Sequence, residues 1–359
     1  MMEVKVLIGL LGLTGAIAGW WIFKKIGIKD RPWPDLTRKY QVPTLQGIML
    51  FVLFLAIMYV FYPNYFSDIR FISFVIAGGI LVLVAVLDEF RKLPSWFRLF
   101  VQILAASVVF FVGWIGFNSI LVGDLVIRLP LRVDFILSVV WFLVFVNALN
   151  WFDGINGQAS WLATLGFFSI ALLTKFIVMP AYWEYIKPSE LYTLEMIVNI
   201  GYVLWVLSFF YFIMEWKPLG LLRDAGVMFL GFALAWLTLL GGGKMGTVLI
   251  VLSLVIFDAI WVILSRIFIY KKNPLKGDYY SHLHFRLMNI GWSREEVRAF
   301  VLIWSLFFMV LVLLQWTNKV AKLTIFFLMA VLFFGVNWYI FVVKKLDKRG
   351  KMYGKEKEN

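Results

Sequence analysis

The sequence predicts an all-α polytopic membrane protein with about eleven transmembrane helices. Apolar residues make up 62% of the 359 positions, and charged residues only 15%. A soluble protein of this length would carry about 25% charged residues. Mean hydropathy is +0.88. The apolar residues also fall in runs of roughly 20, the length that crosses a bilayer.

The proposed spans follow the apolar runs in order: 6–23, 46–62, 71–87, 98–116, 135–149, 159–179, 198–214, 226–242, 246–265, 300–316 and 323–342. The first run lacks a small-residue cleavage pattern and is followed by Lys24 and Lys25, so we expect a span rather than a cleaved signal peptide. Residues 118–134 alternate apolar and polar side chains around Gly123-Asp124, which predicts a short external β-hairpin.

The distribution of positive charge predicts the orientation of these spans. The net charge is +13, which alone could indicate nucleic-acid binding. However, 25 of the 34 lysines and arginines lie in or beside segments on one side of the proposed spans. By the positive-inside rule, the N-terminus is then outside and the C-terminus cytoplasmic. We therefore expect a multi-pass protein of the cytoplasmic membrane and no nucleic-acid partner.

No linker divides the chain, so we expect one integral-membrane domain over residues 1–343 and a basic cytoplasmic tail over 344–359. Anionic headgroups attract such tails, although a plain positive-inside anchor with no specific lipid is the favoured explanation. The chain has no cysteine, which excludes disulfides and thiolate metal sites.

A polar segment follows the fifth proposed span: Asn147-Ala-Leu-Asn-Trp-Phe-Asp-Gly-Ile-Asn-Gly157. Ionisable and amide side chains are costly at membrane depth, so this cluster is a candidate functional site. Its glycines indicate that the backbone approaches another group closely.

Other polar clusters lie on the same predicted side. Asp88 and Glu89 end the third span, close to Lys92 and Arg98. A charged helix end explains these residues structurally. Alternatively, they form a site for phosphate and Mg²⁺, which is usually held by one or two carboxylates plus substrate phosphates. Because the clusters share one side, we expect them to form one site.

Asp224 precedes the eighth span, where it would cap a helix or bind a metal next to a helix N-terminus that favours phosphate. His282 and His284 are the only histidines, and their spacing places them on one side of an extended segment. Because Arg286 is close by, these histidines are better suited to recognising pyrophosphate than to binding zinc. A solvated loop without a binding role is the simpler alternative. Asp258, inside the ninth span, is expected to be an interhelical hydrogen-bond partner.

Taken together, the clusters resemble the polyprenyl-phosphate N-acetylhexosamine-1-phosphate transferase superfamily (glycosyltransferase family 4), which includes the phospho-N-acetylmuramoyl-pentapeptide translocase. The most specific piece is Asn147–Gly157, which is similar to the family's N-A-x-N-x-x-D-G-x-D/N-G. Two further motifs support the resemblance: Leu230-Gly231-Phe232, which follows Asp224, and the H-x-H-x-R-L form at His282–Leu287. The resemblance covers about residues 30–291.

The resemblance implies a Mg²⁺-dependent reaction, with Mn²⁺ as an alternative ion. A membrane polyprenyl phosphate of the undecaprenyl type attacks the β-phosphate of a UDP-HexNAc such as UDP-N-acetylglucosamine. UMP leaves, and a polyprenyl-diphosphate-sugar remains, the first membrane step of a cell-envelope glycan. A basic cytoplasmic cleft would concentrate both anionic substrates. The resemblance is also compatible with a homodimer.

Site roles carry over by position. The resemblance assigns Mg²⁺ binding to Asp224, and deprotonation or orientation of the lipid phosphate to Asp88, with Glu89 beside it. A covalent role for one of these carboxylates stays open. The implied substrate contacts are Lys92 and Arg98 to phosphate, Asn150, Asp153 and Asn156 to the uridine part, and His282, His284 and Arg286 to the sugar and pyrophosphate.

The chain departs from the family pattern at six positions: Glu89 for Asp, Arg223 for Gly, Val227 for Ser, Tyr40 for His, Gln46 for Gly and Phe285 for a third His. The H-x-H-x-R-L form is nearer to the branch of the superfamily that uses simple UDP-HexNAc donors than to the muramoyl-pentapeptide branch.

Two alternatives to the leading function stay open: a muramoyl-pentapeptide transferase, and a catalytically silent relative that binds lipid or nucleotide. A transporter fits less well, because transporter sites usually lie near the bilayer midplane.

Overall fold

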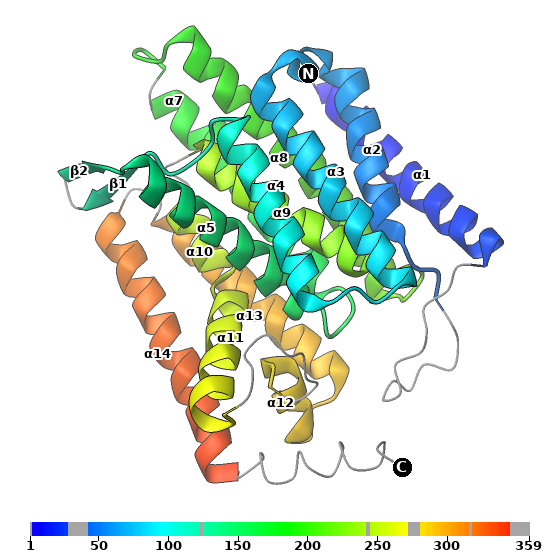
Figure 1. Ribbon diagram of the computed structural model, residues 1–359, viewed down its shortest axis with the longest axis vertical. Helices are drawn as coiled ribbons and strands as arrows, with labels where there is room; N and C mark the ends of the chain where they lie inside the picture. The colour runs from blue at the N-terminus through cyan, green and yellow to red at the C-terminus, as the bar shows by residue number, and fades with distance from the viewer. Residues whose placement is uncertain are drawn as a thin grey trace. The chain divides into compact units, whose positions relative to one another are not determined.

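The computed structural model describes residues 2–27, 42–122, 125–181, 183–241, 245–271, 281–315 and 318–344. In these ranges the chain is almost entirely helical, with one two-stranded sheet (Figure 1). The all-α prediction is therefore confirmed. Residues 30–39, Tyr40, the hairpin tip 123–124 and the tail 345–359 lie outside the described residues.

The longer helices are α1 (Met2–Ile26), α2 (Gln46–Phe61), α3 (Ile69–Phe90), α4 (Ser95–Phe111), α5 (Leu131–Trp151), α6 (Gln158–Leu173), α8 (Pro188–Trp216), α9 (Arg223–Gly241), α11 (Ser253–Leu264), α13 (Arg294–Leu314) and α14 (Lys319–Lys344). The short ones are α7 (Met179–Ala181), α10 (Met245–Val251) and α12 (Leu283–Asn289). A 3₁₀ helix covers Pro63–Ser67, and π-helical turns cover Thr174–Val178 and Ser265–Ile269.

Eight helices in the described ranges are long and apolar enough to cross a membrane, while α2 and α4 are shorter apolar helices. Most of each proposed span lies on a helix or on adjoining helices, although the span 98–116 runs past the end of α4 at Phe111. The chain is thus a multi-pass helical membrane protein, whereas the count of eleven and the outward N-terminus stay predictions. Only 22% of the most apolar window of α1 is buried, so most of this helix presents an apolar surface of the kind that lipid covers.

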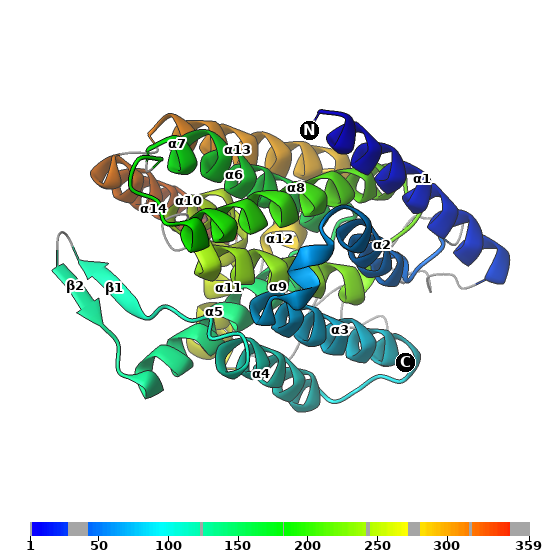
Figure 2. The same ribbon diagram turned by 90° about the horizontal axis from the view of Figure 1, so that it is seen from above.

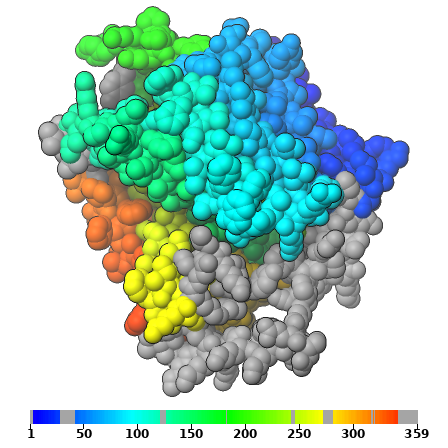
Figure 3. All heavy atoms as spheres, in the orientation of Figure 1, coloured from blue at the N-terminus to red at the C-terminus, as the bar shows by residue number. Residues whose placement is uncertain are grey.

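The chain divides into two compact units, residues 1–248 and 249–359. In the first unit, α9 is the central helix and packs against α2, α3, α5, α6 and α8. Figure 2 shows α9 between α3 and α8. Small residues allow this close packing: a methyl group on Gly231 would lie 2.7 Å from the carbonyl oxygen of Phe145 on α5. In the space-filling view, α3 and α4 (blue to cyan) cover one face of this unit (Figure 3).

The predicted hairpin is present. Strand β1 (Ser119–Val122) pairs antiparallel with β2 (Leu125–Arg128), with Ser119 opposite Arg128. The backbone N–H groups of Phe117 and Asn118 donate to the carboxylate of Asp134 on α5, at 2.8 and 3.1 Å. This buried carboxylate therefore ties the start of the hairpin to the start of α5.

In the second unit, α11 packs against α14, and α12 packs against α13. Asp258 on α11 is buried and accepts two hydrogen bonds from the start of the α12 segment. The structural role expected for Asp258 is confirmed.

Candidate active site

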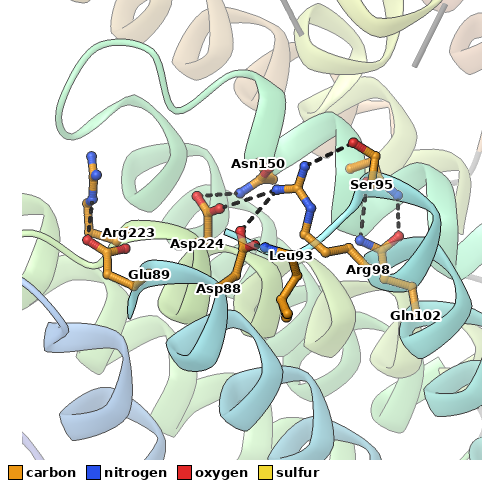
Figure 4. Close-up of polar contacts among 10 residues, drawn as sticks. Asp88, Glu89, Leu93, Ser95, Arg98, Gln102, Asn150, Arg223 and Asp224 are labelled. Carbon is orange, nitrogen blue, oxygen red and sulfur yellow. Dashed lines mark hydrogen bonds and ion pairs between the residues drawn. The ribbon is translucent and has the colours of Figure 1, made fainter. Parts of the chain in front are cut away.

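Four of the residues singled out in the sequence meet at one end of the first unit (Figure 4). Asp88 lies in the last turn of α3, Arg98 in the first turn of α4, Asn150 near the end of α5 and Asp224 at the start of α9. Helix ends from four parts of the chain thus supply one polar cluster.

The Arg98 guanidinium lies between the two carboxylates of this cluster. Its Nη1 donates to Asp88 Oδ2 at 3.2 Å and lies 4.0 Å from Asp224 Oδ2. The Asp88 side chain is 13% exposed, whereas Asp224 is 42% exposed. The two carboxylates therefore face one cation, and the Asp224 carboxylate is the more open to solvent.

Local backbone contacts hold Asp88 and Arg98 in place. The Leu93 N–H donates to Asp88 Oδ1 at 2.6 Å, so the short turn between α3 and α4 closes over this carboxylate. Arg98 Nη2 donates to Ser95 Oγ at 3.4 Å. Because a carboxylate that accepts both a backbone N–H and an arginine is held in one orientation, Asp88 is preorganised.

Asn150 connects the polar segment of the sequence to Asp224. Its Nδ2 donates to Asp224 Oδ1 at 3.1 Å. One turn earlier on α5, Asn147 exchanges hydrogen bonds with Gln102 on α4, at 2.6 and 3.2 Å. This amide pair fixes α5 against α4. Asn147 and Gln102 were not among the predicted site residues, and the signal for them was an amide inside each apolar span.

Two of the departures from the family pattern contact each other. Arg223 Nε donates to Glu89 Oε1 at 3.4 Å, and both side chains are largely buried, at 26% and 20% exposure. Arg223 has a φ of 56°, a left-handed conformation that is costly for residues other than glycine. The pair lies beside Asp88 and Asp224 and fixes the direction in which the chain enters α9.

The backbone around Asp224 is held by contacts that sequence reasoning missed. Leu221 N donates to Pro43 O at 3.0 Å, and Gln46 N donates to Leu221 O at 3.1 Å. A methyl group on Gly47 would lie 2.6 Å from the Gly226 Cα, so α2 and α9 start in direct backbone contact. The only sequence signal was a glycine near the start of each apolar run.

The remaining predicted residues of this unit lie around the cluster. Lys92 is exposed in the α3–α4 turn. Asp153 and Asn156 are half-buried in the turns between α5 and α6, and Gly157 has a φ of 85° just before α6. The polar segment therefore turns between α5 and α6.

In the second unit, His282, His284 and Arg286 are buried. His282 Nδ1 lies 2.8 Å from Asp258 Oδ2, and Leu283 N donates to Asp258 Oδ1 at 2.7 Å. The expectation of an extended segment is wrong, because α12 begins at Leu283. Asp258, although distant in sequence, satisfies a backbone N–H that a helix start leaves without a partner in its own helix. The two imidazole rings still share one side and stack at 5.7 Å.

Arg286 and His284 contribute mainly to the interior of this unit. Arg286 Nη2 donates to the carbonyl oxygen of Asn337 at 2.9 Å, and its guanidinium lies 4.8 Å from the Trp261 ring centre. Burial, and then the neighbouring His282, lowers the pKa of His284 well below its usual value, so its imidazole is neutral at pH 7.

The cluster in the first unit fits a magnesium ion. The Asp88 and Asp224 carboxylates direct oxygen atoms toward one position. In the structure, Arg98 Nη1 occupies that position. No group of three or more His, Cys, Asp or Glu side chains gathers anywhere in the described ranges. Mg²⁺ typically takes one or two carboxylates and completes its shell with water and substrate phosphates, so two carboxylates suffice.

A cavity of about 700 Å³ lies elsewhere in the first unit, lined by Arg70, Tyr192 and Leu240 among others. Arg70 begins α3, and Asp88 lies 18 residues further along the same helix. At 1.5 Å per residue the two are about 27 Å apart. This cavity is therefore separate from the polar cluster.

Comparison with known proteins agrees with this geometry. Residues 71–242, which include Asp88, Arg98, Asn150 and Asp224, match glycosyl transferase family 4. The match covers slightly less than half of the chain, which resembles this family over that stretch. It is 24% identical over 325 residues to a probable undecaprenyl-phosphate N-acetylglucosaminyl 1-phosphate transferase of Bacillus subtilis, covering 84% of this chain and 85% of that protein. It is 30% identical over 138 residues to a phospho-N-acetylmuramoyl-pentapeptide-transferase of Streptococcus thermophilus, covering 34% of this chain and 40% of that protein.

Proposed function

We propose that this protein transfers a HexNAc-1-phosphate from a UDP-sugar to a membrane polyprenyl phosphate of the undecaprenyl type. An oxygen of the lipid phosphate forms a bond to the β-phosphorus of the UDP-sugar. The bond between that phosphorus and the bridging oxygen breaks, UMP leaves, and a polyprenyl-diphosphate-sugar remains.

The observation that carries this proposal is the arrangement of Asp88 and Asp224 on either side of Arg98 Nη1, at 3.2 and 4.0 Å. Phosphoryl transfer between two anionic substrates needs charge neutralisation and positioning more than covalent chemistry from the protein. Two carboxylates and an arginine at the ends of apolar helices supply both at the membrane boundary. The long match to the Bacillus subtilis relative supports the same reaction class.

Asp224 is the proposed Mg²⁺ ligand, and the bound ion would neutralise charge on the diphosphate. Asp224 is the more exposed of the two carboxylates, so an ion that arrives with a nucleotide can reach it. Asn150 orients its other oxygen, Oδ1. The amide of Asn150 therefore acts on Asp224 directly, in addition to its proposed contact with the uridine part.

Asp88 is the proposed base or orienting group for the lipid phosphate. Its carboxylate is held by Leu93 N–H and Arg98, so its free lone pairs point in a defined direction. Arg98 is the proposed phosphate contact. A guanidinium presents paired N–H donors that match phosphate oxygens, so Arg98, which contacts the two carboxylates in the structure, would contact the diphosphate of the donor.

Lys92, Glu89, Asp153 and Asn156 complete the proposed site in the first unit. Lys92 is exposed four residues after Asp88 and can contact phosphate. For His282 and Arg286, the contacts with Asp258 and Asn337 favour a role in shaping the recognition loop. A homodimer and a cytoplasmic location of the site remain part of the proposal.

The test is UMP release by the full-length protein in lipid nanodiscs with undecaprenyl phosphate and Mg²⁺. The donors are UDP-GlcNAc, UDP-GalNAc and UDP-MurNAc-pentapeptide. We expect release with a simple UDP-HexNAc, and loss of at least about 100-fold in Asp224→Asn. Glu195→Gln, an exposed carboxylate on α8, is the matched control.

Each outcome of this panel decides between the candidates. Release only with the pentapeptide donor would favour the muramoyl-pentapeptide transferase, which the match to the Streptococcus thermophilus protein supports. If no donor gives UMP release, the remaining candidate is a catalytically silent lipid- or nucleotide-binding relative. Unchanged turnover in Asp224→Asn would refute the metal assignment.

A further inference from the structure

Glu215 is a buried carboxylate to which the proposed reaction assigns no role. It lies at the end of α8 and is 1% exposed. One carboxylate oxygen, Oε1, accepts the Leu222 N–H at 2.9 Å. The other, Oε2, accepts the hydroxyl of Ser160 on α6 at 2.7 Å. A single buried carboxylate therefore joins α6 and α8 to the residue that directly precedes Arg223 and Asp224.

The connection before α9 is held on both sides. Leu221 exchanges backbone hydrogen bonds with Pro43 and Gln46, at 3.0 and 3.1 Å. Its neighbour Leu222, which is fully buried, is held by Glu215. The next residue, Arg223, has a φ of 56°. A non-glycine residue persists in this conformation only where its surroundings hold it there.

Asp224 follows this bend immediately, so its position depends on the backbone direction at Leu222. Shifting the Leu222 N–H would rotate the start of α9 and move the Asp224 carboxylate relative to Asn150 and Arg98, which contact it at 3.1 and 4.0 Å. Gly226 cannot compensate, because its Cα lies against Gly47.

We propose that Glu215 is a positioning residue for Asp224: its buried carboxylate fixes the Leu222 backbone so that Asp224 presents its oxygens to the metal ion. This inference rests on the proposed function only in taking Asp224 as the metal ligand. Groups that orient a metal ligand commonly contribute about tenfold to a hundredfold to metal affinity.

The test measures Mn²⁺ binding directly, by EPR titration of the full-length protein in nanodiscs, beside UMP release. Glu215→Met keeps a side chain of similar length, but its thioether sulfur is only a weak hydrogen-bond acceptor and carries no charge. Glu215→Gln keeps an oxygen acceptor for the Leu222 N–H. Glu195→Met, an exposed position on the same helix, is the matched control.

We expect the Mn²⁺ Kd to rise about tenfold or more in Glu215→Met, to stay within about threefold in Glu215→Gln, and to be unchanged in the control. A purely structural role would lower thermal stability without moving the Kd. If Glu215→Met does not fold, Glu215→Asp decides, because it keeps the charge but shortens the arm away from Leu222. An unchanged Kd in the folded variant overturns the proposal.

A double-mutant comparison ties the effect to Asp224. In an Asp224→Asn background, Glu215→Met should change residual Mn²⁺ binding by less than about twofold, because the ligand that it positions is gone. Equal losses in both backgrounds would contradict the inference. A failure of the proposed function is distinct, since it would appear as wild-type protein that binds Mn²⁺ but releases no UMP.

Discussion

Glu89 and Arg223 form an ion pair, with Arg223 Nε 3.4 Å from Glu89 Oε1. Each of them replaces a different residue type in the family pattern, and they lie 134 positions apart in the sequence. The two departures from the family pattern, Glu89 and Arg223, are therefore paired with each other in the structure. The arginine charge is turned toward Glu89, which reduces the conflict between Arg223 and a cation on Asp224.

This pairing predicts that the effects of the two substitutions are coupled. Glu89→Gln and Arg223→Gln should each lower kcat/KM for UMP release, and the double variant should lose less than the sum of the single losses. For a partly buried pair, we expect a coupling of roughly 1 kcal/mol, about fivefold. Strictly additive losses in the four-variant cycle would show that the pair has no energetic role at the site.

The hydrogen bond from Asn150 to Asp224 predicts a metal-dependent defect. In Asn150→Ala, the Mg²⁺ concentration needed for half-maximal activity should rise about tenfold, because the carboxylate loses an orienting donor. If Asn150 contacts only the uridine part, the KM for the UDP-sugar would rise instead, with no change in Mg²⁺ dependence. Asn199→Ala is the control, since Asn199 donates to Tyr65 at 2.8 Å, outside the cluster.

The position of Arg98 predicts opposite effects on metal binding and on turnover. Arg98→Gln removes the cation between Asp88 and Asp224, so Mn²⁺ binding without donor should tighten by roughly tenfold. UMP release should fall, because the guanidinium no longer contacts phosphate. EPR titration and the release assay measure the two effects separately. Weaker Mn²⁺ binding in the variant would mean that Arg98 supports the metal site rather than competing for it.

The contact of Gly47 with Gly226 predicts a packing defect on adding one methyl group. In Gly47→Ala, the new Cβ would meet the backbone of α9, which cannot yield as a flexible side chain would. We expect a loss of about 1–3 kcal/mol in stability, measured as a lower Tm in detergent. Gly79→Ala in α3 is the matched control, since its Cβ would meet only Phe51 ring atoms at 3.7–3.8 Å. A similar Tm loss in both variants would contradict the prediction.

The lowered pKa of His284 predicts that stability falls in acid. The folded protein keeps this buried imidazole neutral, while the unfolded chain binds a proton below about pH 6.5. His284 therefore has little effect above that pH and costs up to about 1.4 kcal/mol per pH unit below it. Tm measured from pH 7.5 to 5.5 should decline less steeply in His284→Gln than in wild type. Parallel declines would show that other groups cause the acid sensitivity.

Local patterns in the sequence were enough to predict much of this fold. Each proposed span lies mostly on helical structure, and two paired strands, Ser119–Val122 and Leu125–Arg128, form the hairpin that the alternation indicated. Hydropathy and turn chemistry depend on neighbouring residues, so they can be read without knowing how the helices pack. The motif at Asn147–Gly157 likewise indicated the resemblance to the superfamily, which the comparisons support.

The contacts within the site depended on the tertiary structure. Asn150 and Asp224 are 74 positions apart, and Glu215 reaches Ser160 across 55. Such pairs are set by how α5, α6, α8 and α9 cross and by the direction of each side chain. The helix at Leu283 depends in the same way on Asp258, an acceptor 25 residues earlier in the chain. The sequence by itself determined which segments form apolar helices and which residues are polar, because both are local properties. Only the packing of the helices decided which of those polar residues meet.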